Sequence, residues 1–210
     1  PKRPIVTDPD PTALAATVPP ELAATYRAPE RYGFLDAHGA RLRWAAWAPA
    51  GVSRGSVVLL GGRGEFIEKY ATEIVGELLG RGYSVFALDW RGQGLSDRPL
   101  ADRGKGHIDH FDTYVADLAL FLDRIVVPAA PRPVLAVCHS MGAHIVLRYL
   151  AEAGPGPFAA GVLVAPMTAL RRESLLRSML MVIENGTPGL EVRYAKGELE
   201  PFPITASRWK

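Results

Sequence analysis

Four short apolar runs alternate with segments of helical periodicity, and this alternation is the feature that most constrains the fold. The runs cover residues 57–60, 83–88, 134–137 and 161–164. Nearly continuous apolar runs of this length are typical of parallel strands that are covered on both faces. Helical segments between successive strands are the usual connections of a parallel sheet. The alternation therefore predicts an α/β fold with a mostly parallel sheet and helices on both faces.

Three segments carry the apolar spacing of an amphipathic helix. From position 67 to position 79, apolar residues recur at intervals of three and four residues. The second helical segment covers residues 111–125. The third begins at Ser140 and continues to Ala153, where the sequence Gly-Pro-Gly-Pro ends it. These segments supply one helix after each of the first three predicted strands.

The region before the first apolar run has two parts. Residues 1–30 are rich in proline and alanine and weakly patterned, so we expect an extended leader on the surface of the domain. Residues 31–165 form the predicted core. At its start, residues 33–36 and 41–47 flank the sequence Ala-His-Gly, which predicts an N-terminal β-hairpin.

Beyond residue 165 the alternation of strands and helices stops. We interpret residues 166–210 as a lid or cap segment, with a helix expected over residues 171–185. The apolar residues crowded at 175–183 could bind an acyl chain or form the lid's own core, and the sequence leaves both open. In this arrangement the run at 161–164 would be an exposed edge strand of the sheet.

Charge, cysteine content and hydropathy exclude several classes of protein. The 210 residues include 24 Lys and Arg against 22 Asp and Glu, spread along the chain, whereas nucleic-acid-binding proteins cluster their basic residues. One cysteine excludes an internal disulfide and cysteine-rich zinc sites. No apolar stretch reaches the ~18 residues of a membrane span, and the N-terminus lacks the apolar region of a signal peptide. We expect a cytoplasmic protein without nucleic-acid partners, and peripheral contact with the inner membrane surface stays open.

The strongest chemical signal is the sequence Val-Cys-His-Ser-Met-Gly at residues 137–142, between a predicted strand and a predicted helix. A sharp strand-to-helix turn exposes a serine hydroxyl and requires small residues two positions before and after it. Gly142 meets the second requirement, and Cys138 stands where the pattern Gly-x-Ser-x-Gly has its first glycine. We interpret Ser140 as a nucleophile, with Cys138 and Gly142 supporting the turn, rather than as an ordinary core serine.

A second signal is the sequence Gly-Gly-Arg-Gly at residues 61–64, directly after the first apolar run. Acyl transfer needs two N–H donors for the developing oxyanion. We expect these donors to be the backbone N–H groups of Met141 and Arg63. The rival interpretation is a dinucleotide loop, but the pattern Gly-x-Gly-x-x-Gly fails because Ile67 and Asp97 occupy its last glycine positions. We therefore predict no cofactor.

Several histidines and acids are weaker candidates. His107, Asp109, His110 and Asp112 could hold a metal ion, although such residues more often fix a loop and cap the next helix, so we predict no metal. His144 lies one helical turn after Ser140 and is expected to pack behind it rather than act as a general base. We likewise expect the Cys138 thiol to fill space in the core rather than to act as a nucleophile.

Taken together, these motifs resemble a known family. The sequences GGRGEFIEKY (61–70), DWRGQGLS (89–96) and CHSMG (138–142) occur in this order, with Gly106 and His107 between the last two. They are similar to the α/β-hydrolase fold, in particular to bacterial lysophospholipase and monoacylglycerol-lipase-like serine hydrolases, over about residues 33–170. Two positions depart from the family pattern: Gly61 replaces the usual histidine before the oxyanion loop, and Cys138 replaces a glycine.

The resemblance implies specific roles and a substrate class. Ser140 would be the nucleophile, and the Met141 and Arg63 amides would form the oxyanion hole. A lid would follow the strand that ends near residue 164. The implied reaction is hydrolysis of carboxylic esters, with lysophospholipids or monoacylglycerols as substrates and no cofactor.

The triad acid and histidine are not found in this chain. In this fold the triad residues follow the order serine, acid, histidine. After Ser140 there are six glutamates and no aspartate, and the single later histidine is His144. We therefore expect a chain that stops within or just after the lid, before the strands that carry the acid and the base.

Three hypotheses follow from the missing triad residues. The first is an ester hydrolase completed by residues outside this chain. The second is a non-catalytic α/β-hydrolase fragment that serves as a lipid-binding or interaction module. The third lets His144, His107 or His110 act as the base.

Overall fold

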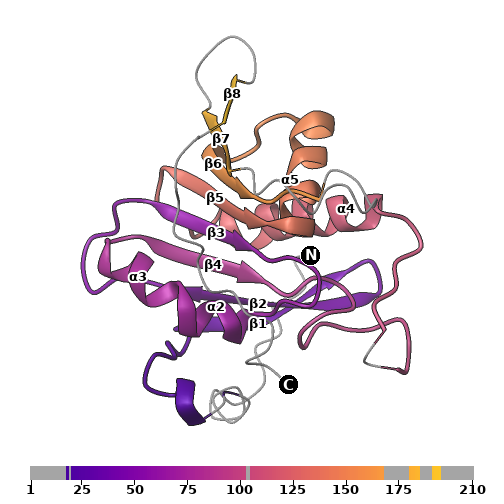
Figure 1. Ribbon diagram of the computed structural model, residues 1–210, viewed down its shortest axis with the longest axis horizontal. Helices are drawn as coiled ribbons and strands as arrows, with labels where there is room; N and C mark the ends of the chain where they lie inside the picture. The colour runs from indigo at the N-terminus through magenta and orange to yellow at the C-terminus, as the bar shows by residue number, and fades with distance from the viewer. Residues whose placement is uncertain (1–17, 19, 103–104, 168–179, 185–190, 195–210) are drawn as a thin grey trace.

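A single mixed sheet forms the centre of the molecule. The computed structural model describes residue 18 and residues 20–102, 105–167, 180–184 and 191–194. Its eight strands lie in the order β1-β2-β4-β3-β5-β6-β7-β8, and helices cover both faces (Figure 1). The predicted architecture, an α/β fold with helices on both faces of the sheet, is thereby confirmed.

The predicted N-terminal hairpin is present. Strands β1 (Arg31–Ala37) and β2 (Ala40–Trp47) pair antiparallel, and β2 pairs antiparallel with β4. His38 and Gly39 connect the two strands with φ values of 51° and 83°. Positive φ at both central residues is the geometry that twists a two-residue hairpin correctly.

The four predicted apolar runs form the parallel centre of the sheet. They are β3 (Ser56–Leu60), β4 (Ser84–Leu88), β5 (Val134–His139) and β6 (Phe158–Val164). Strand β3 pairs in parallel with β4 on one side and with β5 on the other, and β5 pairs in parallel with β6. The carboxyl ends of these strands therefore meet at one edge of the sheet, where ligand sites of open α/β sheets form.

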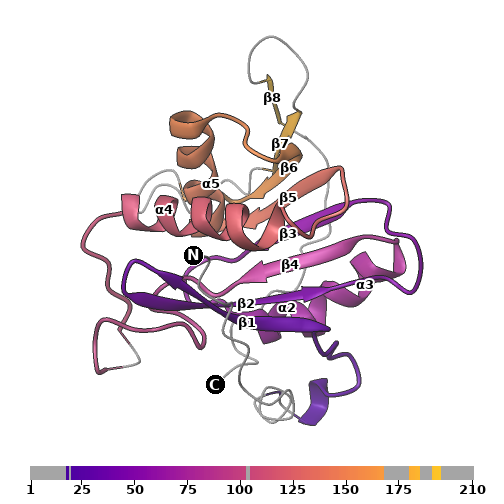
Figure 2. The same cartoon turned by 180° about the vertical axis from the view of Figure 1, so that it is seen from behind.

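The helices divide between the two faces of the sheet. Helices α2 (Ile67–Glu73) and α3 (Val75–Gly80) lie in front of the sheet in Figure 1, and α4 (Asp112–Phe121) lies in front in the reverse view of Figure 2. Helix α5 (Ser140–Ala153) packs beside α4, and a π-helical segment, Leu122–Val126, continues α4. The helix predicted over residues 67–79 is broken at Ile74, whose φ of −120° is not helical.

Successive side chains of the central strands point to opposite faces of the sheet and form two apolar cores. Val57 and Leu59 of β3 pack under α2 and α3, whereas Val58 and Leu60 pack under α4 and α5. Both faces of the central strands are thus buried, which explains why these strands appear in the sequence as continuous apolar runs. A short 3₁₀ helix, η1 (Pro20–Leu22), precedes the sheet, and the Trp47 indole donates to the Arg27 carbonyl at 2.8 Å. The last residues of the leader therefore contact the core.

The segment after β6 departs from the sequence prediction. Strand β7 (Leu180–Glu184) pairs antiparallel with β6, and β8 (Glu191–Tyr194) pairs with β7. The expected helix is therefore wrong over residues 180–184, and the remainder of that expected helix lies outside the described residues. The expectation that 161–164 forms a sheet edge is also wrong, because β7 covers it. Apolar residues of the run at 180–183 satisfy a strand as well as a helix, and periodicity cannot separate the two.

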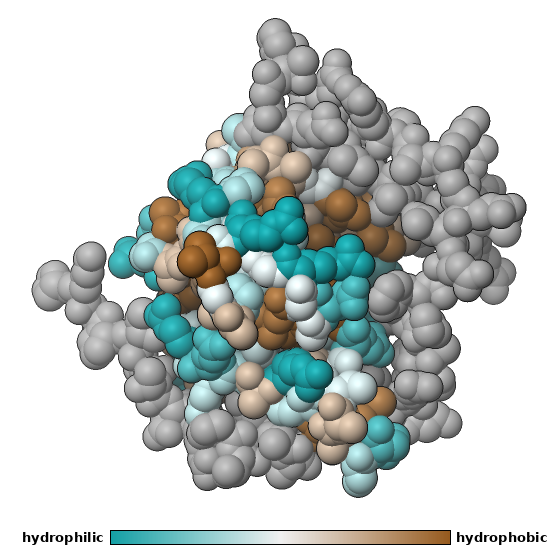
Figure 3. All heavy atoms as spheres, turned by 90° about the vertical axis from the view of Figure 1, so that its left-hand side faces the viewer, coloured by the Kyte–Doolittle hydropathy of each residue, from teal (hydrophilic) through white to brown (hydrophobic). Residues whose placement is uncertain are grey.

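Among the described residues, no helix has the length and apolar character needed to span a bilayer. On the face of the molecule shown in Figure 3, hydrophilic and hydrophobic residues are interleaved.

Candidate active site

Ser140 stands at the turn from β5 into α5. Strand β5 ends at His139, and Ser140 begins the helix with a φ of 49°. A left-handed backbone at a residue other than glycine costs of order 1–3 kcal/mol and is retained where the surrounding structure enforces it. The first N–H groups of a helix have no acceptor within the helix, and that of Met141 is one of them. The predicted strand–turn–helix context of Ser140 is therefore confirmed.

The glycine-rich loop after β3 lies against this turn. A Cβ atom on Gly142 would lie 2.6 Å from the carbonyl oxygen of Gly61 and closer still to that of Leu60. A Cβ atom on Gly62 would lie 3.1 Å from Ser140 Cβ. The loop and the turn thus approach each other at positions that have no side chain. This contact brings the Arg63 loop to Ser140, as the oxyanion hypothesis requires.

Side chains fix the backbone of the loop on both sides of Arg63. The N–H of Gly62 donates to Glu65 Oε2 at 2.5 Å, and the N–H of Gly64 donates to Gln93 Oε1. Gly61 is held as well, because the Trp90 indole donates to its carbonyl oxygen at 2.8 Å. The roles of the Arg63 and Met141 amides in binding an oxyanion stay predictions.

The buried carboxylate of Glu65 is a functional candidate that the sequence reasoning missed. Besides the Gly62 N–H, it accepts from Lys69 Nζ at 2.6 Å and from the Tyr70 hydroxyl at 2.5 Å. His139 Nδ1 lies 3.0 Å from Glu65 Oε2. The i,i+4 spacing of Glu65 and Lys69 is visible in the sequence, but the contact with His139 joins residues 74 positions apart. We call Glu65 and its four partners the Glu65 cluster.

The Glu65 cluster holds an ionised carboxylate. Burial by itself raises the pKa of Glu65, but hydrogen bonds from His139, Lys69, Tyr70 and Gly62 outweigh burial and hold the pKa below its usual range. Burial and the neighbouring Glu65 charge raise the pKa of Tyr70, so its hydroxyl remains a proton donor. Glu65 is therefore an acceptor for all four of its partners.

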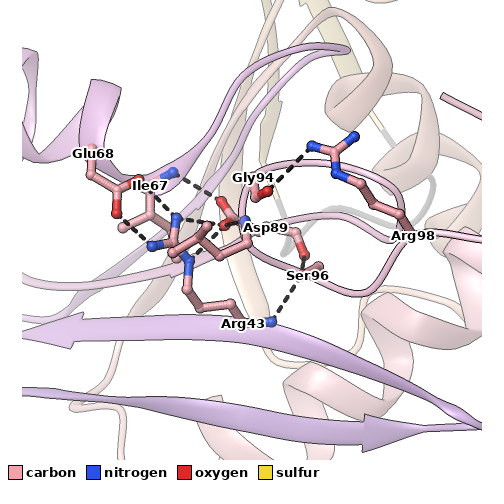
Figure 4. Close-up of polar contacts among 8 residues, drawn as sticks. Arg43, Ile67, Glu68, Asp89, Gly94, Ser96 and Arg98 are labelled. Atoms are coloured by element: carbon pink, nitrogen blue, oxygen red, sulfur yellow. Dashed lines mark hydrogen bonds and ion pairs between the residues drawn. The ribbon is translucent and has the colours of Figure 1, made fainter. Parts of the chain in front are cut away.

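A second buried cluster supports the loop that carries Gln93. The Arg43 guanidinium lies between two carboxylates, with its Nη1 2.5 Å from Glu68 Oε1 and its Nε 2.6 Å from Asp89 Oδ2 (Figure 4). Asp89 in turn accepts the backbone N–H of Ile67 at the start of α2 and that of Leu95, each at 2.9 Å. Asp89 thus links β2, α2 and the loop after β4. These contacts explain the aspartate in the DWRGQGLS sequence as a structural residue.

Cys138 lies in the interior, below the turn. Its side chain is 1% exposed and belongs to the core under α4 and α5. Burial raises the pKa of the Cys138 thiol well above its usual value, so the thiolate that a nucleophile needs is disfavoured. The structure agrees with the interpretation of Cys138 as a small core residue.

The histidines proposed as alternative bases have other neighbours. The His144 ring packs edge-to-face on Phe111, with the ring centroids 5.0 Å apart. Burial and the nearby Arg148 charge lower the pKa of His144. His107 Nε2 lies 2.9 Å from Asp109 Oδ1 at the surface, and His110 is exposed. Among the described residues, no group of three or more His, Cys, Asp or Glu side chains is arranged to hold a metal ion.

Comparison with known proteins agrees with this geometry. The serine aminopeptidase S33 family profile matches residues 51–208. Lysophospholipase L2 of Escherichia coli K12 is 37% identical over 143 residues, which are 67% of this chain and 42% of that protein. Non-heme chloroperoxidase of Streptomyces lividans is 40% identical over 87 residues, which are 41% of this chain and 28% of that protein. The chain therefore spans less than half the length of these relatives.

A solved structure supports the fold independently. A soluble variant of monoglyceride lipase from Saccharomyces cerevisiae superimposes with a TM-score of 0.60 at 22% identity, over 72% of this chain and 49% of that chain. The serine at a left-handed strand-to-helix turn, the glycine-rich loop beside it and the profile match lead to one assignment. The chain belongs to the serine aminopeptidase S33 family and has the α/β-hydrolase fold.

Proposed function

We propose that the protein is a serine hydrolase that cleaves carboxylic esters through an acyl-enzyme on Ser140. The observation that carries the proposal is the left-handed φ of 49° at Ser140, at the start of α5 and beside the glycine-rich loop. This conformation exposes a nucleophile where helix N-terminal amides can stabilise negative charge. The similarity to lysophospholipase L2 supports lysophospholipids as the substrate class, and the proposal keeps monoacylglycerols as the second class that the sequence resemblance implies.

In the proposed reaction, Ser140 Oγ attacks the ester carbonyl carbon as its proton passes to a general base. The oxyanion of the tetrahedral intermediate accepts hydrogen bonds from the Met141 and Arg63 amides. The alcohol then leaves with a proton, and water releases the fatty acid from Ser140 in a second, equivalent addition. No metal or cofactor takes part in this scheme.

The base and its supporting acid are part of the proposal. The chain has five histidines, and the structure places His144 against Phe111, His107 beside Asp109 and His139 beside Glu65. We propose that a histidine and an acid outside these 210 residues complete the site, in the order serine, acid, histidine. The relatives that match this chain are more than twice as long as the matched segment.

A fluorophosphonate probe tests the nucleophile. The wild type in this test is the polypeptide that includes the proposed acid and histidine. We expect it to be labelled and to release fatty acid from lysophosphatidylcholine, and Ser140→Ala to lose both activities. Ser53→Ala is the matched control, because Ser53 lies in the loop before β3, at the opposite end of that strand from Ser140. Equal labelling of wild type and Ser140→Ala would contradict the proposal. A wild type that is neither labelled nor active would favour the non-catalytic module. One observation that motivated the module, an exposed edge at β6, no longer supports it, because β7 pairs with β6.

A further inference from the structure

Glu65 joins the two segments between which the proposed oxyanion site lies. Its Oε2 atom accepts from Gly62 in the glycine-rich loop and lies 3.0 Å from Nδ1 of His139, the residue before Ser140. Its Oε1 atom accepts from Lys69 on α2. The carboxylate is 8% exposed, so its contacts with Gly62 and Lys69 are buried, and its contact with the 31%-exposed His139 side chain is partly buried. A single buried side chain therefore ties the loop, the turn and the helix together.

An ionised carboxylate requires every one of its hydrogen-bonding partners to be a donor. It can only accept, so the His139 Nδ1 atom carries the proton that faces Glu65. Lys69, 5% exposed at its side chain, balances the negative charge of Glu65. If Glu65 served only to stabilise the fold through its ion pair with Lys69, it would need neither the contact with Gly62 nor the contact with His139. These two contacts are the ones that point to a role at the site.

Glu65 acts on the loop at the Arg63 amide, because side chains hold the amides on both sides of it. Glu65 takes the N–H of Gly62, and Gln93 takes the N–H of Gly64. Within the described part of the chain, no protein group accepts the N–H of Arg63, which lies between them. Holding both neighbours fixes the direction of the Arg63 N–H and leaves it available to a substrate oxygen. Preorganised donors of this kind contribute most to the stabilisation of an oxyanion.

We propose that Glu65 is a positioning residue, which sets the Arg63 amide and the Ser140 turn for oxyanion binding through Gly62 and His139. This inference rests on the proposed function, since it assigns a role within the same ester hydrolysis. It predicts that Glu65 acts on the transition state rather than on substrate binding.

Glu65→Gln tests the proposal against a matched variant, Glu68→Gln. In Glu65→Gln, the amide NH₂ faces either Lys69 or the three donors Gly62, Tyr70 and His139. At least one contact is lost, and the remaining contacts lose the charge that strengthens them, while the volume of the side chain is kept. We expect kcat for a short-chain nitrophenyl ester to fall about 10- to 100-fold, KM to stay within about threefold, and fluorophosphonate labelling to slow in parallel. Glu68 lies on α2, is 3% exposed and pairs with Arg43, and among the described residues its side chain makes no hydrogen bond to Gly62 or His139. Glu68→Gln should lower Tm but leave kcat within about threefold of wild type.

A pair of His139 variants keeps the test valid if Glu65→Gln does not fold. Asparagine places a donor near the position of His139 Nδ1, whereas valine has none. We expect His139→Asn to keep kcat within about threefold and His139→Val to lose about tenfold or more. A merely structural role would lower Tm in His139→Val without this difference in kcat.

The outcomes separate this inference from the proposed function. An unlabelled and inactive wild type overturns the proposed function, and this inference with it. An active wild type with unimpaired Glu65→Gln overturns the inference alone. Equal losses of kcat in Glu65→Gln and Glu68→Gln would also overturn it, because a general loss of packing would then explain both. Selective loss in Glu65→Gln and His139→Val supports it.

Discussion

The Arg43 guanidinium lies 2.5 Å from the Asp89 carboxylate, and both side chains are almost completely removed from solvent. Arg43 also pairs with Glu68, so one arginine balances two buried carboxylates. Burial lowers the pKa of Arg43, but Asp89 and Glu68 outweigh burial and raise it, which keeps the guanidinium charged. Breaking such a cluster leaves uncompensated charge inside the protein.

Arg43→Met should therefore destabilise the fold strongly. Methionine matches the arginine stem in length but leaves the Glu68 and Asp89 carboxylates unpaired, and we expect a loss of about 3–5 kcal/mol in the free energy of unfolding. Urea denaturation at neutral pH measures the loss. Arg81→Met is the control, because Arg81 pairs with Glu77 at the surface and should cost less than about 1 kcal/mol. Similar costs for both variants would show that the buried cluster has no special role.

Gly142→Ala should disrupt the contact between the Ser140 turn and the glycine-rich loop at residues 61–64. The added Cβ would lie 2.6 Å from Gly61 O, so the backbone must shift, at a cost of about 1–3 kcal/mol or more. We expect a lower Tm and slower fluorophosphonate labelling. Gly80→Ala is the control, since nothing lies within 4 Å of its added Cβ, and the change should be neutral or slightly stabilising. A Gly142→Ala variant with wild-type Tm and labelling would contradict the close packing described here.

Cys138 should report on unfolding through its reactivity. Its burial and raised pKa predict that iodoacetamide alkylates the native protein about 100-fold or more slowly than the guanidinium-unfolded protein. Because Cys138 is the single cysteine of the chain, total alkylation measured by mass spectrometry follows this one site. Rapid alkylation of the native protein would show that the turn opens or that the thiol is accessible.

The Glu65 cluster should make stability fall in acid. The folded-state pKa of Glu65 lies below its ordinary value of 4.5, so the unfolded chain binds its proton first as the pH falls. The contribution of Glu65 is therefore fully present above about pH 4.5 and is lost progressively below it. Urea denaturation at neutral pH and near pH 4 should show a smaller loss of stability in Glu65→Gln than in wild type. An identical pH dependence in both proteins would contradict an ionised Glu65.

His144→Ala should keep catalytic turnover. The ring packs on Phe111, so its removal should cost stability, about 0.5–1.5 kcal/mol for the aromatic contact plus the lost packing. Nitrophenyl-ester hydrolysis at a temperature below the unfolding transition measures the effect. A fall in kcat comparable with that of Ser140→Ala would establish His144 as the base and overturn the assignment of the base to a residue outside this chain.

The elements that the sequence predicted correctly are those whose formation depends on residues close together in the chain. The hairpin turn at His38-Gly39, the four central strands and the helix that begins at Ser140 follow from periodicity, apolar runs and turn residues. The run at 180–183 was assigned wrongly to a helix, because a short apolar run suits either element and pairing with β6 decides between them.

The sequence by itself determined the order of strands and helices as far as β6 and the strand–turn–helix context of Ser140, because these depend on neighbouring residues. Only the tertiary structure decided that Glu65 meets His139 and that Arg43 meets Asp89. These partners lie 74 and 46 positions apart. Glu65 meets His139 because parallel pairing brings the carboxyl ends of β3 and β5 together, whereas Arg43 meets Asp89 because β2 pairs antiparallel with β4. A buried charge requires a partner of opposite charge or a hydrogen bond, but the charge alone does not determine which residue that partner is. The topology of the chain determines it.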